Sequence, residues 1–270
     1  MKIFISSDIE GTNGIASWSE GDKANGGEFN YFAARMTEEV NAVCLGVNDF
    51  SPDADILVKD SHATARNIDH RGLPSNTRLN RGWPGQPASM VNHLDGSFDA
   101  AIFTGYHSPA FTGGNPMAHT INSAKISRIT INGVIAGEFH INYYAALSLG
   151  VPPVMVSGDK LLAELVAETD KDILTVVTLE GSGNSTTSAH HSVTLRQLRG
   201  AAKEAAARAA ELKTKVKSKL PGSFEVTITY RRHYDAFRAS YFPGMYVVDD
   251  MTVGYKCENF FDYLKAWMLL

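Results

Sequence analysis

Cysteine is scarce in this sequence. Cys44 and Cys257 are the only two cysteines in 270 residues, and neither belongs to a CxxC pattern. This scarcity excludes a small disulfide-stabilised fold and a cysteine-rich zinc module. An apolar export signal is also missing near the start, because Asp8 and Glu10 interrupt the first apolar stretch. We therefore expect a cytoplasmic protein with reduced thiols.

Long apolar runs and an excess of one charge are missing too. The longest apolar run, AALSLGVPPVMVSG, is too short to cross a bilayer and contains two prolines. Lysine and arginine number 25 against 29 aspartates and glutamates, which gives a net charge of −4. This mildly acidic balance provides no electrostatic reason to bind nucleic acid or an anionic membrane. We expect neither of them as a partner.

Strand and helix signals alternate along most of the chain, which is typical of an α/β fold with a largely parallel sheet flanked by helices. Apolar segments predict strands at residues 2–9, 55–61, 98–106 and 151–159. Helical spacing of apolar residues predicts helices at 31–50, 140–150 and 160–169. The pair Asn132-Gly133, favoured in type I′ turns, predicts a hairpin over 127–139.

The character of the sequence changes after a Gly/Ser/Thr-rich connection at 178–192. A long Ala- and charge-rich helix is predicted at 194–218, and the segments at 224–231, 246–256 and 259–270 indicate a small α+β unit. We place a boundary near residue 185. The predicted organisation is an α/β catalytic domain at 1–185 and a smaller α+β domain at 186–270, with oligomerisation as its candidate role.

Side chains able to bind a metal follow several of the predicted strands. They are Asp8 and Glu10 after the first strand, Asp60 and His62 after the second, His107 after the third, and Glu138 after the hairpin. Ligands of open α/β sheets bind at the carboxyl ends of the strands. Each residue alone has an ordinary explanation as a solvated or hydrogen-bonded side chain. Their placement together at one edge of the sheet indicates a common site.

Asp8 and Glu10 lie two residues apart, so in a strand they point to the same face and repel each other. Divalent cations between them would remove that conflict. Imidazole and carboxylate ligands together suit zinc or manganese. Their number suits two metals that share a bridging carboxylate, an arrangement common in metal-assisted hydrolysis. The other histidines are predicted to be surface residues: His70, His93, His140, His190, His191 and His233.

Five short motifs resemble the DppA-type D-aminopeptidases, a family of metallopeptidases with two zinc ions. They are DIEG from Asp8, DSH ending at His62, GYH ending at His107, MAHT containing His119, and GE ending at Glu138. The motifs occur in the expected order, whereas the last third of the chain resembles the family only in its general layout. The resemblance implies a metal-dependent aminopeptidase that removes the N-terminal residue of short peptides or amino-acid amides.

The resemblance also implies a role for each of these residues. Asp8 corresponds to the bridging ligand, Glu10 and His62 to ligands of one zinc, and His107 and Glu138 to ligands of the other. His119 corresponds to the catalytic histidine, as a general acid–base or as a nucleophile. Two Zn²⁺ per chain are implied, with Mn²⁺ or Co²⁺ as substitutes. The namesake prefers D-residues and forms a ring-shaped homo-oligomer, a decamer.

Two positions depart from the family pattern. Lys59 stands where asparagine is expected, and His140 stands where a small residue is expected, close enough to the predicted metals to alter the substrate pocket. The preference for D- or L-residues therefore stays open. Two other functions also stay open. A two-metal phosphoesterase is weakly supported, because only Lys59, Arg66 and Arg128 lie near the motifs. A metal-binding protein without turnover would not need His119.

Overall fold

The computed structural model describes residues 1–270 and contains two β-sheets. The larger sheet has seven strands, in the order β3 (Thr77–Asn80), β2 (Asp55–Asp60), β1 (Lys2–Ser7), β4 (Ala100–Tyr106), β7 (Pro153–Asp159), β8 (Leu174–Ser182) and β9 (Ser185–Thr187). Every neighbouring pair from β3 to β8 is parallel, and only β9 is antiparallel to its neighbour. The predicted α/β class with a largely parallel sheet is confirmed.

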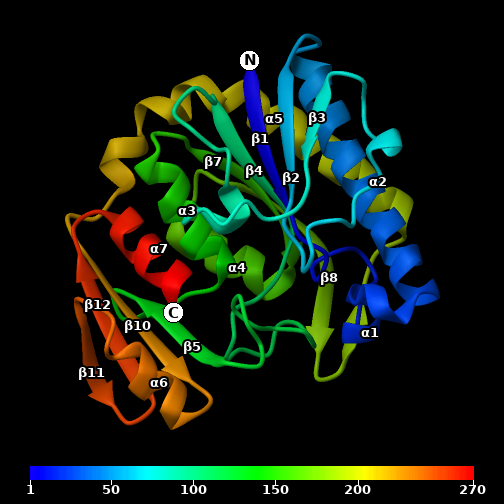
Figure 1. Cartoon of the computed structure of the whole chain (residues 1–270). Coiled ribbons are helices and arrows are strands. Elements are labelled where there is room, and N and C mark those ends of the chain that lie inside the picture. The colour runs from blue at the N-terminus through cyan, green and yellow to red at the C-terminus, as the bar shows by residue number, and fades with distance from the viewer.

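The first strand lies inside the larger sheet (Figure 1). From β1 the chain adds β2 and β3 on one side, and then returns to add β4, β7 and β8 on the other. The strand order therefore reverses between β1 and β4. Crossovers on the two sides leave a crevice at such a reversal, outside the carboxyl ends of the two strands. This crevice is where the first and third predicted strands end.

Alternating residues of the sheet belong to two separate cores. Ile3 and Ile5 of β1 pack with α2 (Gly27–Phe50) and α5 (His191–Thr214) on one face. Phe4, between them, packs on the other face, where α3 (Glu138–Ser148) and α4 (Lys160–Thr169) contribute to the core. This two-residue alternation is what a strand buried on both faces requires. The helices not yet mentioned are α1 (Trp18–Gly21), α6 (His233–Ala239) and α7 (Phe260–Leu269). None of the helices combines the length and the apolar character needed to cross a membrane.

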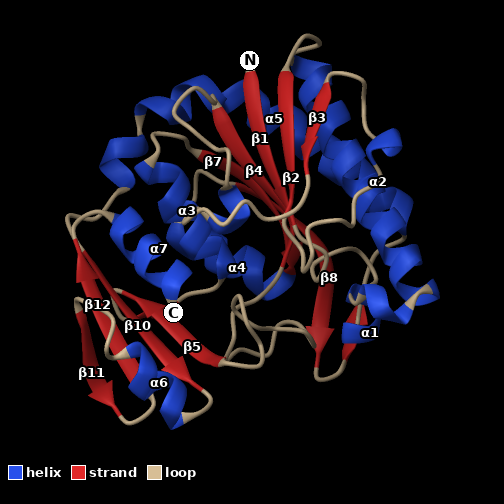
Figure 2. Ribbon diagram, viewed as in Figure 1, coloured by secondary structure: helices blue, strands red, loops and turns tan.

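The smaller sheet is antiparallel and stands apart from the larger one in the ribbon view (Figure 2). Its strands run in the order β11 (Met245–Asp249), β12 (Thr252–Cys257), β10 (Phe224–Tyr230), β5 (Ile126–Ile131) and β6 (Val134–Ile135). The β5–β6 hairpin is the predicted one: both Asn132 and Gly133 have positive φ, as a type I′ turn requires.

The smaller sheet takes strands from both sides of residue 185, because β5 pairs with β10. Helix α5, predicted to begin the C-terminal unit, packs with α2 on the larger sheet. The division into 1–185 and 186–270 stays a prediction about units of folding. The structure also contains elements that the sequence did not indicate: α1, α6, β3, and the β8–β9 hairpin where a Gly/Ser/Thr-rich connection was expected.

Candidate metal centre

The predicted ligands converge on the crevice between β1 and β4. Asp8 and Glu10 follow β1 directly, and His107 follows β4. His62 comes from the loop after β2, and Glu138 is the first residue of α3. All five side chains are buried, although each is ionisable. Burying so many ionisable groups together is costly unless they are paired or hold metal ions.

Two glycines allow the loops after β1 and β4 to approach each other closely. A Cβ added to Gly11 would lie 1.9 Å from the Tyr106 carbonyl oxygen. A Cβ added to Gly105 would lie 2.3 Å from the Asp8 carbonyl oxygen, and Gly105 has a φ of +66°. The Gly11 amide donates to the Gly105 carbonyl at 2.8 Å. The glycines of DIEG and GYH are therefore required by backbone contact, which fixes Asp8 beside His107.

The Asp8 carboxylate lies between two histidines. Its Oδ1 is 3.2 Å from His62 Nδ1, and its Oδ2 is 3.7 Å from His107 Nε2. Glu10 Oε2 is 3.0 Å from the same nitrogen of His62, and Glu138 Oε2 is 3.5 Å from that of His107. Two groups of three potential ligands result, Asp8–Glu10–His62 and Asp8–His107–Glu138, each with its ligand atoms within 4.8 Å of one another. Asp8 belongs to both.

A backbone carbonyl fixes the tautomer of each histidine. His62 Nε2 lies 2.8 Å from the Gly21 oxygen, and His107 Nδ1 lies 2.9 Å from the Ser108 oxygen. A carbonyl oxygen only accepts hydrogen bonds, so these nitrogens carry the hydrogen of the neutral ring. The opposite nitrogens, His62 Nδ1 and His107 Nε2, then present lone pairs to the carboxylates. Such outer hydrogen bonds are what orient histidines that bind metals.

The buried carboxylates of the cluster favour the binding of positive charge. Burial and the neighbouring Glu10 raise the pKa of Asp8. Burial alone would raise the pKa of Glu138 as well, but the facing His107 lowers it to about 2. Burial opposes protonation of His62 and His107, yet the facing carboxylates raise the pKa of both. The cluster thus attracts protons to the positions that divalent cations would occupy.

Two buried atoms of the cluster have no hydrogen-bond partner, Glu10 Oε2 and His107 Nε2. Buried polar atoms without a partner are uncommon in native proteins, and each needs an explanation. Of the two groups that share Asp8, Glu10 belongs to one and His107 to the other. A metal ion in each group would satisfy both atoms. Carboxylate oxygens and imidazole nitrogens are ligands that zinc accepts.

His119 lies beside this cluster, in the loop after β4. Its ring stacks on that of His107, with 4.3 Å between centroids and 7° between planes, and the Trp18 ring packs against it at 5.1 Å. Its Nδ1 lies 3.0 Å from the Met117 carbonyl oxygen, so Nε2 is the free nitrogen, 3.6 Å from Glu138 Oε1. Burial and the neighbouring His107 lower the pKa of His119, which favours the neutral ring. His119, His107 and Glu10 also form a third group of potential ligands.

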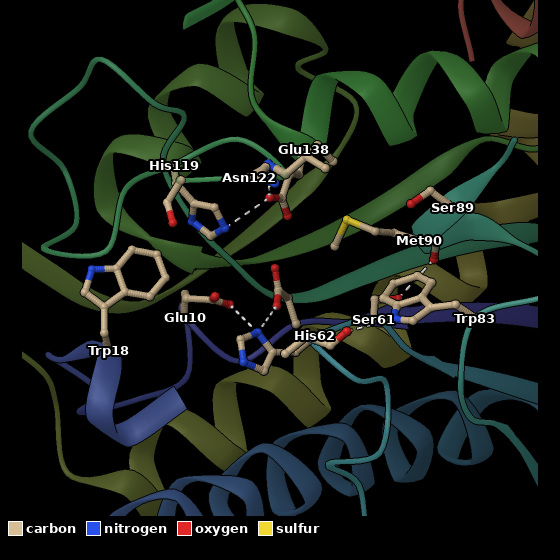
Figure 3. A pocket seen from close by; sticks show the side chains of 14 residues that line it. Glu10, Trp18, Ser61, His62, Trp83, Ser89, Met90, His119, Asn122 and Glu138 are labelled. Carbon is tan, nitrogen blue, oxygen red and sulfur yellow. Dashed lines mark hydrogen bonds and ion pairs between the residues drawn. The ribbon is translucent and has the colours of Figure 1, made fainter. Parts of the chain in front are cut away.

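A cavity of about 430 Å³ opens over the cluster. Its lining includes Trp18 and Trp83, which Figure 3 shows on opposite sides of Glu10 and His62. Three lining residues that are not glycine have positive φ: Ala63 at 45°, Ser89 at 44° and Ile121 at 62°. Residues in this region are uncommon and tend to gather at functional sites. The volume is that of a small-ligand pocket.

Sequence reasoning missed both tryptophans. Trp18 had a usable signal: it begins α1 within the pattern Ser-Trp-Ser-Glu, and Ser17 and Glu20 form a capping box in the structure. No sequence signal marked Trp83, because it lies in a loop without a periodic pattern. The position of this loop depends on its tertiary contacts.

Asp60, predicted as a further acid beside His62, has a structural role. Its carboxylate accepts hydrogen bonds from the Asn67 and Ile68 amides and from the Asn67 side chain. It belongs to none of the groups of potential metal ligands. It shapes the loop that carries His62.

His140 was predicted to be a surface residue, and this prediction is wrong. It is buried at the start of α3, where its Nδ1 accepts a hydrogen bond from the Gly137 amide, and burial lowers its pKa to about 4. It lines a different cavity from the one over the metal ligands. His140 therefore does not contact the predicted substrate pocket, and the expected effect on that pocket could only be indirect. The surface prediction is confirmed for the exposed histidines, His70, His93, His190 and His233. His191 is half-buried and pairs with Glu38 at 2.7 Å.

Comparison with known proteins adds independent findings. The chain matches the family described as D-aminopeptidase, Peptidase_M55, over residues 1–269. It is 30% identical over 274 residues to the D-aminopeptidase of Bacillus subtilis strain 168, and the match covers 100% of this chain and 96% of that relative. Among solved structures it is similar to the Zn-dependent D-aminopeptidase DppA from Bacillus subtilis, a self-compartmentalizing protease. That likeness has a TM-score of 0.86 at 25% identity and covers 100% of this chain and 96% of the other.

Proposed function

The chain belongs to the D-aminopeptidase family Peptidase_M55, and from this premise we propose that its buried cluster binds two zinc ions. The enzyme would use them to remove the N-terminal residue of short peptides or amino-acid amides. It is a metal-dependent aminopeptidase, a hydrolase of peptide bonds. One observation carries the two-zinc proposal: Asp8 belongs to two groups of ligands at once and directs one oxygen toward each of two histidines.

The proposed assignment gives each zinc one histidine and one glutamate besides the shared aspartate. Glu10 and His62 would hold one ion, and His107 and Glu138 the other. Bound there, the ions supply Lewis acidity that polarises the scissile carbonyl and lowers the pKa of water. Mn²⁺ or Co²⁺ would be accepted by the same ligands. The partnerless Glu10 Oε2 and His107 Nε2 support this assignment.

We assign proton transfer to His119. Its Nδ1 is held by the Met117 carbonyl, so Nε2 is the nitrogen that takes up or releases a proton. Stacking on His107 and the contact with Trp18 restrict the ring, and the ring borders the cavity. A neutral imidazole with a fixed free nitrogen suits a general base that becomes a general acid toward the leaving amine. Direct attack by His119 on the carbonyl is the second possibility.

Cleavage from the amino terminus follows from the charge of the cluster. A protonated α-amine would be attracted by the buried carboxylates beside the cavity, whereas a neutral α-amine would offer its lone pair to a bound metal ion. Preference for D-residues is proposed from the relatives, both named D-aminopeptidase. The similar solved structure is called self-compartmentalizing. We accordingly propose that this chain forms a homo-oligomer, with the decamer as the expected size. Its two free cysteines agree with the expected cytoplasmic location.

The phosphoesterase alternative receives no support from the cavity. Its lining contains no lysine and no arginine, whereas phosphate sites use such side chains to neutralise the substrate. A metal-binding protein without turnover is disfavoured by the open cavity and by His119 at its edge.

Metal analysis followed by a substrate panel tests the proposal. The purified protein, saturated with zinc, should contain two ions per chain. It should hydrolyse D-aminoacyl amides faster than their L-enantiomers, and it should refuse the same substrates once their amine is acetylated. Turnover of p-nitrophenyl phosphate without cleavage of any amine-bearing substrate would favour the phosphoesterase instead.

A further inference from the structure

Trp83 forms one wall of the cavity and is fixed from behind by a buried lysine. The residue is 42% exposed, yet its Nε1 donates to the Ala63 carbonyl at 2.7 Å. The Lys59 Nζ lies 4.3 Å from the centre of the ring and donates to the Gly82 carbonyl at 2.6 Å. An exposed indole is normally mobile. Here the ring and the preceding peptide are both held, so the indole is a rigid surface toward the cavity (Figure 3).

The lysine that holds Trp83 is unusual. Lys59 lies within β2 and is fully buried, with an exposed fraction of 0%. A buried ammonium is costly unless it is partnered. Its direct partners are the Gly82 carbonyl and the Trp83 ring, both in the same loop. These two contacts therefore hold the loop in place. Among aromatic side chains, an indole forms the strongest cation–π interaction.

The two sides of the cavity differ in their relation to His119. Trp18 packs directly against His119, whereas Trp83 lies across the cluster, together with Ser61, Ser89 and Met90 (Figure 3). A proton donor to the leaving amine must stand on the leaving-group side of the scissile bond. The N-terminal residue of the substrate would then lie on the opposite side of the cluster, toward Trp83.

We propose that Trp83, held by Lys59, determines specificity by packing against the side chain of the substrate's N-terminal residue, and that the preferred substrates begin with an aromatic or large aliphatic residue. This inference rests on the proposed aminopeptidase function and deepens it. Trp83 and Met90 supply apolar contact on this side, and an aromatic side chain gains further from an indole face. Charged N-terminal side chains find no ionic partner there, because the lining beyond the metal ligands and His119 carries no charge.

The test compares substrates that differ only in the N-terminal side chain. The parent enzyme should have a higher kcat/KM for phenylalanine amide than for alanine amide, each in the configuration that it accepts. Trp83→Ala should lower the ratio of these two values roughly tenfold or more, since the indole contact is lost only for the larger side chain. Trp83→Phe should restore most of the ratio. Lys59→Met should lower it less, because the indole keeps its hydrogen bond to the Ala63 carbonyl and loses only the contact with the ammonium group.

Trp18→Ala is the matched control, since it removes the indole from the other side of the same cavity. It should leave the phenylalanine-to-alanine ratio as in the parent, although overall turnover falls. If Trp83→Ala cleaves both amides with an unchanged phenylalanine-to-alanine ratio, this inference is wrong, while the proposed aminopeptidase function stands. A change seen only when the leaving group is varied would overturn the inference as well. If the parent enzyme cleaves no amine-bearing substrate, the proposed function fails and this inference fails with it.

Discussion

The rings of His107 and His119 stack face to face, with 4.3 Å between centroids and 7° between planes. Each ring is fixed by its own backbone carbonyl, that of Ser108 for His107 and that of Met117 for His119. The two free nitrogens nevertheless have different surroundings. His107 Nε2 is buried without a partner between Asp8 and Glu138, whereas His119 borders the open cavity. Adjacent histidines of the same tautomer type can thus serve different purposes.

Substitution of the two histidines should separate these purposes. His107→Ala should lower metal content and activity together. His119→Ala should retain both metals and the fold but lose roughly 10²–10⁴ in kcat, the usual contribution of general acid–base catalysis. Metal titration and steady-state kinetics on both variants provide the measurement. Loss of a metal from His119→Ala, or near-normal kcat, would show that the assignment is wrong.

The shared position of Asp8 predicts an asymmetry among the carboxylates. Asp8→Ala should bind less than one zinc per chain, because both groups of ligands lose a member. Glu10→Ala should retain about one, since the group around His107 and Glu138 stays intact. Zinc content after dialysis, measured by elemental analysis, distinguishes the two. Equal stoichiometry in both variants would argue against a bridging carboxylate.

The contact between the two glycine-containing loops predicts a large cost for an added methyl group. Gly105→Ala forces a positive φ and a clash with the Asp8 carbonyl, so we expect a loss of about 3 kcal/mol or more in the free energy of unfolding. Zinc affinity should fall as well, because Asp8 is displaced. Gly113→Ala is the control: it is exposed, and an added Cβ there meets nothing within 4 Å. Urea denaturation of both variants makes the comparison, and equal midpoints would contradict it.

Glu39 predicts a pH dependence of stability that is independent of the metal site. Its carboxyl group is buried on α2, where Oε1 accepts from the Asn13 amide and Oε2 has no partner. Burial raises its pKa from 4.5 to about 8. Between these values the unfolded chain releases the proton while the folded chain keeps it. The stability contribution is therefore fully present below pH 4.5 and is lost as the pH rises toward 8, by at most about 5 kcal/mol.

Glu39→Gln should remove this part of the pH dependence. The free energy of unfolding of the metal-free parent and variant should differ little at pH 5, and the variant should be the more stable at pH 9. Parallel pH profiles for the two proteins would show that Glu39 is ionised in the folded state.

The sequence predicted four of the seven strands of the larger sheet, β1, β2, β4 and β7, and the proposed ligands near their ends, because both depend on local pattern. Apolar strands are recognisable by composition, and Asp8, His62 and His107 sit directly after them. The pairing of β5 with β10 could not be predicted, since the two strands are far apart in the chain and no short-range pattern encodes their register. The same holds for α5, whose Ala-rich face packs on α2 rather than within the C-terminal unit.

Burial of single polar side chains was the least predictable feature. His140 follows Glu138 by two residues in a helix whose whole first turn is buried, and no alternation in the sequence marks that. Lys59 is buried because a distant loop brings the Trp83 ring and a carbonyl to its ammonium group. Contacts of this kind arise only once the fold has formed.

The protein has few cysteines for disulfide cross-links, but its proposed metal ligands come from separate segments of the chain. Under the proposed assignment the ions join four segments, at residues 8–10, 62, 107 and 138, which are separated by long stretches of chain. Two ions bound to them would act as cross-links of the kind that disulfides provide elsewhere, because unfolding would have to release the ions or carry closed loops. Zinc would then set how long the protein survives proteolysis and heating as well as whether it is active, and a cell short of zinc would lose the enzyme itself along with its activity.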